Sequence, residues 1–565
     1  MFPLHYENFS QLFTTPQIFV YLIVAVINGV LLYFCSLKFL LVLQQCGYRG
    51  KRYFKWLRNA ETPYLSRLML LSLLGLLFFC ALNMCFEPVF TTFFGQEWGD
   101  AIASYAGMLS YVLFTVIYIN SESHVNAKVP LKKTKRLVRL AITFSILLVA
   151  ITFGLIVGLN YLAFILGDDV VCLLRLSLIC VMPLLSPFIL FLAYCINEPL
   201  EWVIRKHYIK GATYKLKTTK VIKIGITGSY GKTGVKEILK TILSQKFRVL
   251  STPDSYNTPL GISLSVKKLD NTVDVFIAEM GARSKGDIKE LVDIVKPEYG
   301  VLTGINSQHL ETFGSIENTI STKLELLKGL PEDGIAFINS ETKYLEQINE
   351  QYSGEKFFSG LNEDANVYAT DIKISAQGTT FILNIKGEEP ITCSTILLGK
   401  NSIINICLAS SVAYKMGMTP QEICEGINRL QSIEHRLELV RNNKNIVLID
   451  DSYNSNEDGA LAAMEVLDLF QGRKIVVTPG LVELGKEENI ANYNFGRILS
   501  EHADKVIVVG KHNAVMLING LKDAGMEVEN IKFSKNLKRG NDVLSEMLEE
   551  GDVVLFENDL PDNYN

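Results

Sequence analysis

The chain has few cysteines for its 565 residues, and they follow no metal-binding pattern. Seven of the ten cysteines precede residue 200, and none forms a CxxC pair or a Cys/His cluster with zinc spacing. Low-complexity tracts and internal repeats are lacking as well. We therefore interpret the cysteines as small apolar residues of the protein interior, and the sequence predicts no zinc site.

The chain also carries little net charge. Its 55 Lys and Arg residues against 59 Asp and Glu residues give −4 at pH 7. The basic residues gather in short runs between apolar segments, where membrane orientation explains them. This balance argues against a nucleic-acid partner.

Hydrophobic residues make up 48% of the chain, and their excess is concentrated before residue 200. Five apolar stretches there are each close to the roughly 20 residues that cross a bilayer as a helix. They are long, nearly uncharged and without a polar face, which is typical of membrane spans rather than of buried helices in a soluble domain. We predict five transmembrane helices, at about 18–37, 68–86, 102–119, 140–166 and 170–196.

The charges of the connecting loops predict the orientation. Basic residues collect in the first loop, the third loop and after the last stretch, whereas the loops at 87–100 and 167–169 are acidic. Lys and Arg concentrate on the cytoplasmic side, so we expect a multi-pass protein of the cell membrane, with the N-terminus outside and residues from 197 onward in the cytoplasm. The segment Met1–Gln17 has no positive n-region, so no cleaved signal peptide is predicted.

Arg175 is the one strongly charged residue well inside an apolar stretch. An ionisable group there is a candidate functional residue. It lies near the outer end of the stretch, so snorkelling to lipid headgroups and binding of a lipid phosphate are both open. Pro183 and Pro187 predict a kink in the same helix, serving either a lipid groove or packing alone.

The stretch Gly225–Thr233, GITGSYGKT, follows a short β-branched run and leads into a helical pattern. A strand, a glycine-rich turn and a helix N-terminus together form a phosphate cradle. Backbone N–H groups around Gly228 and Gly231 would point at phosphate oxygens, Lys232 would reach the terminal phosphates, and the Thr233 hydroxyl would hold Mg²⁺. The sequence therefore predicts an ATP or GTP site. The alternative is a tight turn that uses its glycines for clearance.

From about residue 220, short apolar runs alternate with helical segments, which is typical of a parallel sheet covered by helices. A second such set begins near Asn445, so we place a domain boundary close to residue 433. Chemically active side chains follow three of the runs, namely Glu279, His309 and the pair Asp450 and Asp451. Ligands are expected beyond the carboxyl ends of such strands, although a carboxylate there can also simply cap a helix.

The expected fold class is an α-helical membrane domain with five transmembrane helices, followed by two α/β domains. We assign residues 1–200 to the membrane domain and 201–220 to a basic linker. The central ATP-binding domain is expected over 221–432 and the C-terminal domain over 433–565.

The chain from about 222 to 555 resembles the Mur ligase family, the ATP-dependent amide ligases that build the peptide of bacterial cell walls. The shortened loop TGSYGKT is the family's form, and DDSYN followed by Asn456 most resembles the MurF type, which adds D-alanyl-D-alanine. The resemblance implies a P-loop central domain and a Rossmann-like C-terminal domain. The matching motifs follow in the family's order: SYNTPLGI, AEMG with Glu279, the His309 segment running into FGS, TKLELLKGLPEDGIAFIN with Lys323, HRLE with Arg436, DDSYN and VELG.

The resemblance also implies the chemistry: a substrate carboxylate attacks the γ-phosphate of ATP, and an amine then displaces phosphate from the acyl phosphate. The implied catalytic residues are Lys232, His309, Lys323 and Arg436. Thr233, Glu279, His309 and a carbamylated Lys323 are the implied Mg²⁺ ligands. An ordinary surface lysine and a surface salt bridge are the alternatives for Lys323 and Arg436. The implied nucleotide contacts are Gly228, Ser229, Tyr230, Gly231, Lys232, Thr233, Asn405, Arg436, Asp451 and Asn454.

Several features depart from the family pattern. Membrane helices stand where the family has a soluble domain for the UDP-sugar part of its substrate. The adenine segment reads GKNSIIN, so only Asn405 is carried over, and Gly234 replaces the second hydroxyl residue of the loop. The C-terminal lysine-glycine-serine signature is replaced by ENDLPDNYN, which leaves amine specificity open.

Three functional hypotheses follow. The first is a membrane-anchored MurF-like ligase that joins D-alanyl-D-alanine or another amino acid or peptide to a cell-wall precursor, with ATP and Mg²⁺. Its acceptor is UDP-linked or, since the helices would deliver it naturally, lipid-linked. The second is an amide ligase resembling poly-γ-glutamate synthases. The third is a membrane transport or lipid-binding protein that its nucleotide domain regulates.

Overall fold

The computed structural model describes residues 15–58, 63–81, 87–95, 106, 109, 111–120, 131–166, 168–253, 256–306, 313–441, 445–453, 456–482, 484 and 487–558. The chain divides into two compact units, Met1–Ile204 and Arg205–Asn565.

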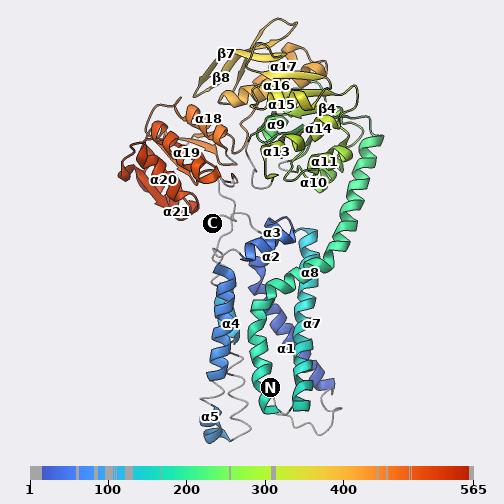
Figure 1. The fold of residues 1–565 in the computed structure, drawn as a ribbon, viewed down its shortest axis with the longest axis vertical. Coiled ribbons are helices and arrows are strands. Elements are labelled where there is room, and N and C mark those ends of the chain that lie inside the picture. The colour runs from blue at the N-terminus through green and yellow to red at the C-terminus, as the bar shows by residue number, and fades with distance from the viewer. Residues whose placement is uncertain are drawn as a thin grey trace. The chain divides into compact units, whose positions relative to one another are not determined.

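The described part of the first unit is helical (Figure 1). Three of its helices contain segments long and apolar enough to cross a membrane, namely Ile18–Cys35, Lys135–Leu162 and Met182–Thr218. They correspond to the first, fourth and fifth predicted spans. The helices are α1 (Thr15–Cys35), α2 (Leu37–Gln45), α3 (Gly50–Arg58), α4 (Pro63–Ala81), α5 (Glu87–Phe94), α7 (Lys135–Leu166), α8 (Asp168–Thr218) and a short apolar helix, Tyr111–Asn120.

The second and third predicted spans lie only partly within the described residues. The segment 68–86 includes most of α4, and the segment 102–119 includes most of the helix Tyr111–Asn120. By length and composition, the described residues therefore contain three candidate spans of the five predicted. Arg175 lies on α8, but the surroundings of its side chain are outside the described part.

Polar side chains join the apolar helices of the first unit. Asn28 Nδ2 on α1 donates to Thr152 Oγ1 on α7 at 3.2 Å, and Tyr111 OH donates to Asn28 Oδ1 at 3.0 Å. Arg139 on α7 donates to both carboxylate oxygens of Glu201 on α8, at 2.6 and 2.8 Å. Apolar side chains alone pack in many registers, so these directional bonds help to fix which helix faces meet.

Helix α8 runs without a break from the first unit into the second, although Pro183, Pro187 and Pro199 lie inside it. Its last turns belong to the second unit, where Ala212 and Leu216 are buried in one of the apolar clusters. The predicted linker 201–220 is thus helical as far as Thr218.

The residues from β1 to α17, called the central domain below, form a nine-stranded sheet in the order β2-β3-β1-β4-β5-β6-β7-β8-β9. The strands from β2 to β7 pair in parallel, and β8 and β9 extend the sheet in antiparallel pairing. The strands are β1 (Ile222–Thr227), β2 (Val249–Ser251), β3 (Val275–Glu279), β4 (Tyr299–Leu302), β5 (Ile335–Asn339), β6 (Lys356–Gly360), β7 (Val367–Ser375), β8 (Gly378–Ile385) and β9 (Ile391–Thr395).

Helices cover the parallel part of this sheet, because its strands are apolar on both faces. Ile224 and Ile226 of β1 pack with the helices α9 and α16, whereas Phe276 and Ala278 of β3 pack with α11 and the end of α8. The helices are α9 (Lys232–Leu243), α10 (Pro259–Val266), α11 (Asp287–Val295), α13 (Ile316–Lys323), α14 (Glu325–Lys328), α15 (Leu345–Gln351), α16 (Lys400–Lys415) and α17 (Pro420–Asn428).

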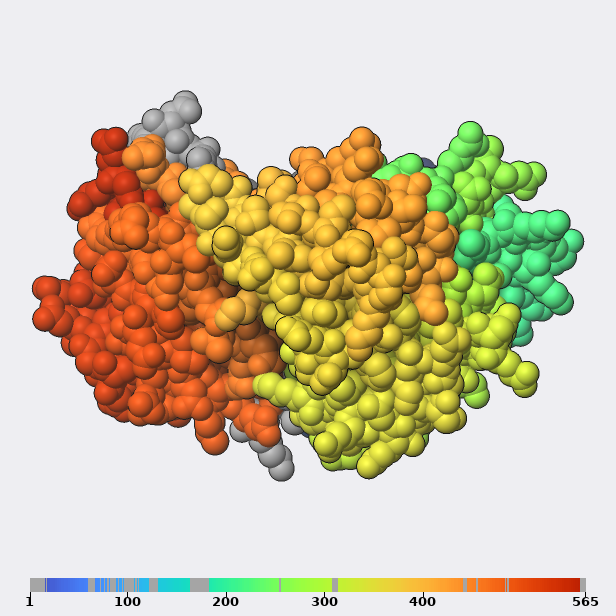
Figure 2. Space-filling model, turned by 90° about the horizontal axis from the view of Figure 1, so that it is seen from above, coloured from blue at the N-terminus to red at the C-terminus, as the bar shows by residue number. Residues whose placement is uncertain are grey.

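The residues from β10 to β15, called the C-terminal domain below, form a six-stranded sheet in the order β10-β11-β15-β12-β13-β14. All pairs are parallel except β10 with β11. Figure 2 shows residues of this domain in deep orange and red, with the yellow β7–β8 part of the central domain also at the surface. The elements are β10 (Glu438–Arg441), β11 (Val447–Asp451), α18 (Glu457–Leu467), β12 (Lys474–Thr478), α19 (Glu488–His502), β13 (Lys505–Val509), α20 (Ala514–Asp523), the 3₁₀ helix η4 (Val528–Asn530), β14 (Ile531–Ser534), α21 (Leu537–Met547) and β15 (Val553–Glu557).

Candidate functional site

The glycine-rich loop lies where the sequence predicts it, between β1 and α9. Gly231 takes a left-handed conformation, φ 75°, directly before the first residue of α9. The loop is held against the end of β4, since Ser229 N donates to Gly304 O at 2.7 Å and Thr303 Oγ1 donates to Tyr230 O. The N-terminus of α9 with its free N–H groups thus opens beside the loop, which is the arrangement that binds phosphate.

Glu279 lies next to this loop because β3 is a direct neighbour of β1. The register pairs Ile226 with Glu279, so the carboxylate emerges at the carboxyl edge of the sheet. Thr233 Oγ1 donates to Glu279 Oε2 at 3.0 Å, and Asn257 Nδ2 donates to Glu279 Oε1 at 3.2 Å. The structure thus brings together Thr233 and Glu279, which were predicted as metal ligands from separate segments.

A hydroxyl and a carboxylate side by side fit a Mg²⁺ ion, which prefers oxygen ligands and takes few of them from the protein. Within the described residues, no group of three or more His, Cys, Asp and Glu side chains is arranged to hold a metal. Thr233 and Glu279 would therefore hold the ion together with phosphate oxygens and water. His309, the third predicted ligand, lies outside the described residues.

Lys232, the lysine of the loop, has a lowered pKa. Burial lowers the pKa of Lys232 to about 8; the Glu279 carboxylate opposes this shift and the Arg436 guanidinium adds to it. Lys232 Nζ donates to the loop carbonyls Gly228 O and Ser229 O, at 2.8 and 3.0 Å. Its ammonium is thus at the loop, where it would meet phosphate oxygens.

Lys323, the last residue of α13, is almost completely buried. Burial and then the charge of Lys232 lower its pKa well below the ordinary value, and Asp287 and Glu325 oppose this. Its Nζ lies 5.8 Å from the centre of the Phe313 ring. The structure thus rules out the alternative of an ordinary surface lysine. Carbamylation stays a prediction.

Asn405 on α16 lies against the loop. A Cβ atom built on Gly231 would be 3.0 Å from Asn405 Oδ1, and one built on Gly234 would be 3.4 Å from Asn405 Nδ2. The absence of a side chain at Gly231 is what allows this approach. Asn405 is therefore the part of the predicted adenine segment that reaches the phosphate-binding loop.

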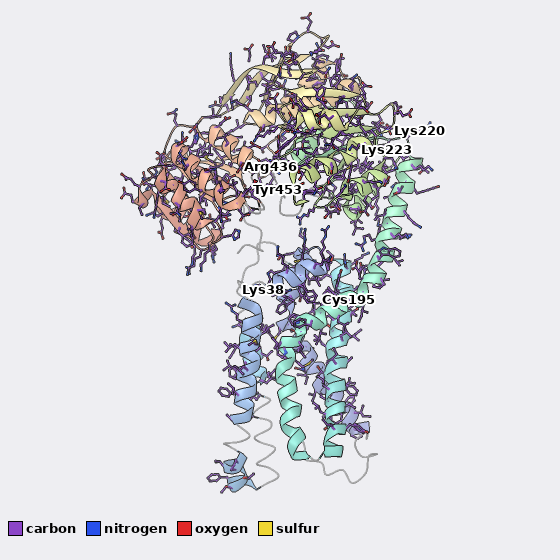
Figure 3. The ribbon with its side chains drawn as sticks, in the orientation of Figure 1. Lys38, Cys195, Lys220, Lys223, Arg436 and Tyr453 are labelled. Carbon is purple, nitrogen blue, oxygen red and sulfur yellow. The ribbon has the colours of Figure 1, made fainter. Side chains whose placement is uncertain are left out.

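The C-terminal domain presents Arg436 from a tightly wound segment. His435 and Leu437, the residues on either side, both have positive φ angles, 60° and 47°, which non-glycine residues adopt rarely. The Arg436 guanidinium stacks 4.4 Å from the centre of the Tyr453 ring (Figure 3). Two strained residues that hold one cation in place are a typical sign of a functional segment.

Asp451 ends β11 beside this segment. Its Oδ1 accepts a hydrogen bond from Leu437 N at 3.3 Å. Burial raises the pKa of Asp451 to about 6, against the effects of Arg436 and of the Leu437 N–H. Asp451 thus lies beside the segment that carries Arg436, and the nucleotide contacts predicted for both residues stay predictions. Asn454, predicted beside them, lies outside the described residues.

Sequence reasoning missed two residues that contact Glu279. Asn257 lies within the motif SYNTPLGI but had been given no role. Lys236 Nζ lies 3.3 Å from Glu279 Oε2, and its side chain is fully buried. The signal was present, since Lys236 follows Thr233 by three residues and Lys232 by four, which places all three on one face of a helix.

Comparison with known proteins identifies the two α/β domains. The family model of the Mur ligase middle domain matches residues 226–413, and that of the Mur ligase glutamate ligase domain matches residues 435–557. Together the two models cover more than half of the chain. The chain belongs to the Mur ligase family. The resemblance predicted from its motifs is thereby confirmed.

Two curated relatives of this Mur ligase carry the same enzyme name. The chain is 29% identical over 336 residues to the UDP-N-acetylmuramoyl-tripeptide--D-alanyl-D-alanine ligase of Bacillus subtilis (strain 168), covering 59% of this chain and 72% of the relative. It is 31% identical over 296 residues to the enzyme of the same name from Escherichia coli (strain K12), covering 51% of this chain and 65% of the relative. The chain thus spans about two thirds of the length of these relatives.

Solved structures agree on the fold of this Mur ligase. The MurF ligase of Thermotoga maritima in complex with ADP matches with a TM-score of 0.56 at 26% identity, covering 63% of this chain and 80% of that structure. MurF from Acinetobacter baumannii matches with a TM-score of 0.57 at 24% identity, covering 63% of this chain and 77% of that structure. The predicted Mur ligase central and C-terminal domains are thus confirmed as folds.

Proposed function

We propose that this Mur ligase is a MurF-like, ATP-dependent amide ligase that joins D-alanyl-D-alanine, or another amino acid or peptide, to a cell-wall precursor at the cytoplasmic face of the membrane. The observation that carries the proposal is the Thr233–Glu279 contact of 3.0 Å beside Lys232 in the glycine-rich loop. The names of the relatives and the ADP complex of the Thermotoga maritima structure support the substrate class and the nucleotide.

The loop residues carry the phosphoryl-transfer half of the reaction. Phosphoryl transfer depends on positioning and on neutralising the charge of the transferred group. The N–H groups from Gly228 to Thr233 would orient the phosphates of ATP, with Lys232 and Arg436 as the cations against them. A Mg²⁺ ion at Thr233 and Glu279 would supply further positive charge.

The remaining assignments follow from the family resemblance. Glu279 and His309, helped by a carbamylated Lys323, would hold a second Mg²⁺ ion. Asn405, Asp451 and Asn454 would contact the nucleotide or join the domains. Arg436 would meet the phosphates when the domains close around the substrates, as in other enzymes whose domains exclude water during the reaction.

The membrane assignment rests on the apolar helices and the charges of the loops. Three candidate spans are consistent with an integral membrane protein, and the proposed five-span topology places the N-terminus outside and the ligase domains in the cytoplasm. A lipid-linked acceptor would reach such an enzyme from the bilayer itself. A UDP-linked acceptor would have to reach it from solution.

The test is phosphate release by the detergent-purified full chain with Mg-ATP. D-alanyl-D-alanine is offered together with either a UDP-linked or a lipid-linked muramoyl peptide, and products are identified by mass spectrometry. Amine-dependent phosphate release with a new amide product supports the proposal, and the productive acceptor identifies the substrate. Release without any amide product would contradict it.

Variants of two lysines on α9 sharpen the test. Lys232→Ala should lower the rate by about 100-fold or more, since one group that stabilises the transferred charge is lost. Lys240→Ala, on an exposed position of the same helix, should leave the rate unchanged. Repeated addition of a single amino acid would instead support the poly-γ-glutamate-synthase-like alternative, and full function of Lys232→Ala would support the regulated membrane protein.

A further inference from the structure

Lys236 is a fully buried cation in the wall of the nucleotide site. Its Nζ lies 3.3 Å from Glu279 Oε2, the same oxygen that accepts the hydrogen bond of Thr233 Oγ1. A second carboxylate, Glu237 Oε1, lies 3.5 Å away and is on the more exposed side of α9. Lys236 thus bridges a surface carboxylate and the buried carboxylate of the site.

Three side chains contact the carboxylate of Glu279, and Thr252 accepts a hydrogen bond from its backbone. Thr233 and Lys236 meet Oε2, Asn257 Nδ2 donates to Oε1 at 3.2 Å, and the Glu279 backbone N donates to Thr252 Oγ1 at 3.1 Å. Of the three side chains that contact its carboxylate here, Lys236 is the cation. A buried carboxylate needs such compensation, because leaving one charged and unpaired is costly.

The position of Glu279 creates an electrostatic conflict. Nucleotide phosphates are anions, and a bare carboxylate beside the loop would repel them over several ångströms. A divalent cation removes this repulsion once it is bound. The Lys236 ammonium is placed to reduce this repulsion before the divalent cation binds.

We propose that Lys236 is a positioning residue that neutralises Glu279 whenever no divalent cation is bound, so that the loop accepts a nucleotide before the metal arrives. It also holds Oε2 toward Thr233, so the two metal-binding side chains keep their arrangement in the empty site. This inference rests on the proposed nucleotide binding and adds the order in which nucleotide and metal can bind.

The test compares ADP affinity with EDTA and with excess Mg²⁺, by isothermal titration calorimetry on the full chain in detergent. Lys236→Met keeps the length of the side chain and removes its charge. It should weaken ADP binding in EDTA on the order of tenfold or more and weaken it much less in Mg²⁺. Lys236→Arg should restore binding in EDTA. Lys240→Met, on the exposed side of the same helix, should behave like the wild type.

A second pair of variants separates charge compensation from a general structural role. In Glu279→Gln the carboxylate is gone, so adding Lys236→Met should no longer weaken ADP binding in EDTA. Equal losses with and without Mg²⁺, or the same loss in the Glu279→Gln background, would overturn the inference. Failure of the wild type to bind ADP under both conditions would instead overturn the proposed function.

Discussion

Gly228 lies in the phosphate-binding loop with a positive φ of 157°, and it has no room for a side chain. A Cβ atom there would overlap Thr303 Oγ1 and lie 3.0 Å from the backbone oxygen of Gly304. Thr303 cannot turn away freely, because it is fully buried and its hydroxyl donates to Tyr230 O. Gly228→Ala must therefore overpack the loop and push the Thr303 side chain out of this hydrogen bond.

The cost can be worked from these contacts. Overpacking of a close-packed site costs about 1–3 kcal/mol, and loss of the Thr303 hydrogen bond adds about 1 kcal/mol. If the loop must regain its conformation to bind nucleotide, a total of about 2–4 kcal/mol weakens the affinity by roughly 30- to 1,000-fold. The Kd for ADP in Mg²⁺, measured by titration calorimetry, should rise by this factor.

A second substitution tests the proposed cause. Thr303→Ala removes the atom nearest to the new Cβ, so Gly228→Ala should cost less in that background, and the cost that remains comes from the backbone of Gly304 and the φ of 157°. Gly286→Ala is the matched control, since Gly286 also has a positive φ, 89°, but nothing lies within 4 Å of its added Cβ. If the losses of Gly228→Ala and Thr303→Ala simply multiply in the double variant, or if Gly228→Ala binds like the wild type, the steric reasoning is refuted.

Three further predictions concern other parts of the chain. Burial raises the pKa of Asp451 from 3.8 to about 6. The folded state therefore binds more protons than the unfolded state between these values, and the C-terminal domain should lose stability as the pH rises from about 4 to about 6. Asp451→Asn should abolish this loss, which is measured as the hydrogen-exchange protection of β11 at each pH. The Sγ atoms of Cys393 and Cys424 lie 2.7 Å apart in the core of the central domain. The oxidant diamide, which takes up the two thiol hydrogens, should therefore join them in a disulfide. Mass spectrometry after alkylation that still finds both of these cysteines as free thiols would contradict this. Arg139→Gln should destabilise the detergent-solubilised protein by about 1–3 kcal/mol, since Arg139 donates to both carboxylate oxygens of the largely buried Glu201. The expected result is a lower melting temperature, which the added substitution Glu201→Gln partly restores.

The sequence was sufficient for the parts of the site that depend on local patterns. The glycines, Lys232 and Thr233 are contiguous, and a strand followed by a helix fixes where they lie. Glu279 could be added because the carboxyl ends of neighbouring parallel strands meet at one edge of a sheet. The structure has β3 and β4 on either side of β1, which is what this reasoning requires.

Residues whose role depends on packing were beyond the sequence. The spacing places Lys236 on the same helix face as Lys232 and Thr233, but only the position of β3 shows that Lys236 is a buried partner of Glu279. The conformation that presents Arg436 depends on positive φ angles at His435 and Leu437, which no residue preference predicts. The basic segment 201–220 looks like a linker by composition, but Ala212 and Leu216 make it a packed helix.

The charges around the loop bear on the predicted carbamate at Lys323. A carbamate forms only from the unprotonated amine, and burial together with the charge of Lys232 lowers the pKa of Lys323 well below its ordinary value. At any given pH, a larger share of Lys323 is therefore unprotonated than of an exposed lysine. Carbamylation would place an anion beside Lys232, and Lys232 would then hold its proton more firmly. The same burial that makes Lys323 unfavourable as a cation thus favours the neutral amine that reacts with carbon dioxide, and the Lys232 ammonium would compensate the charge of the resulting carbamate.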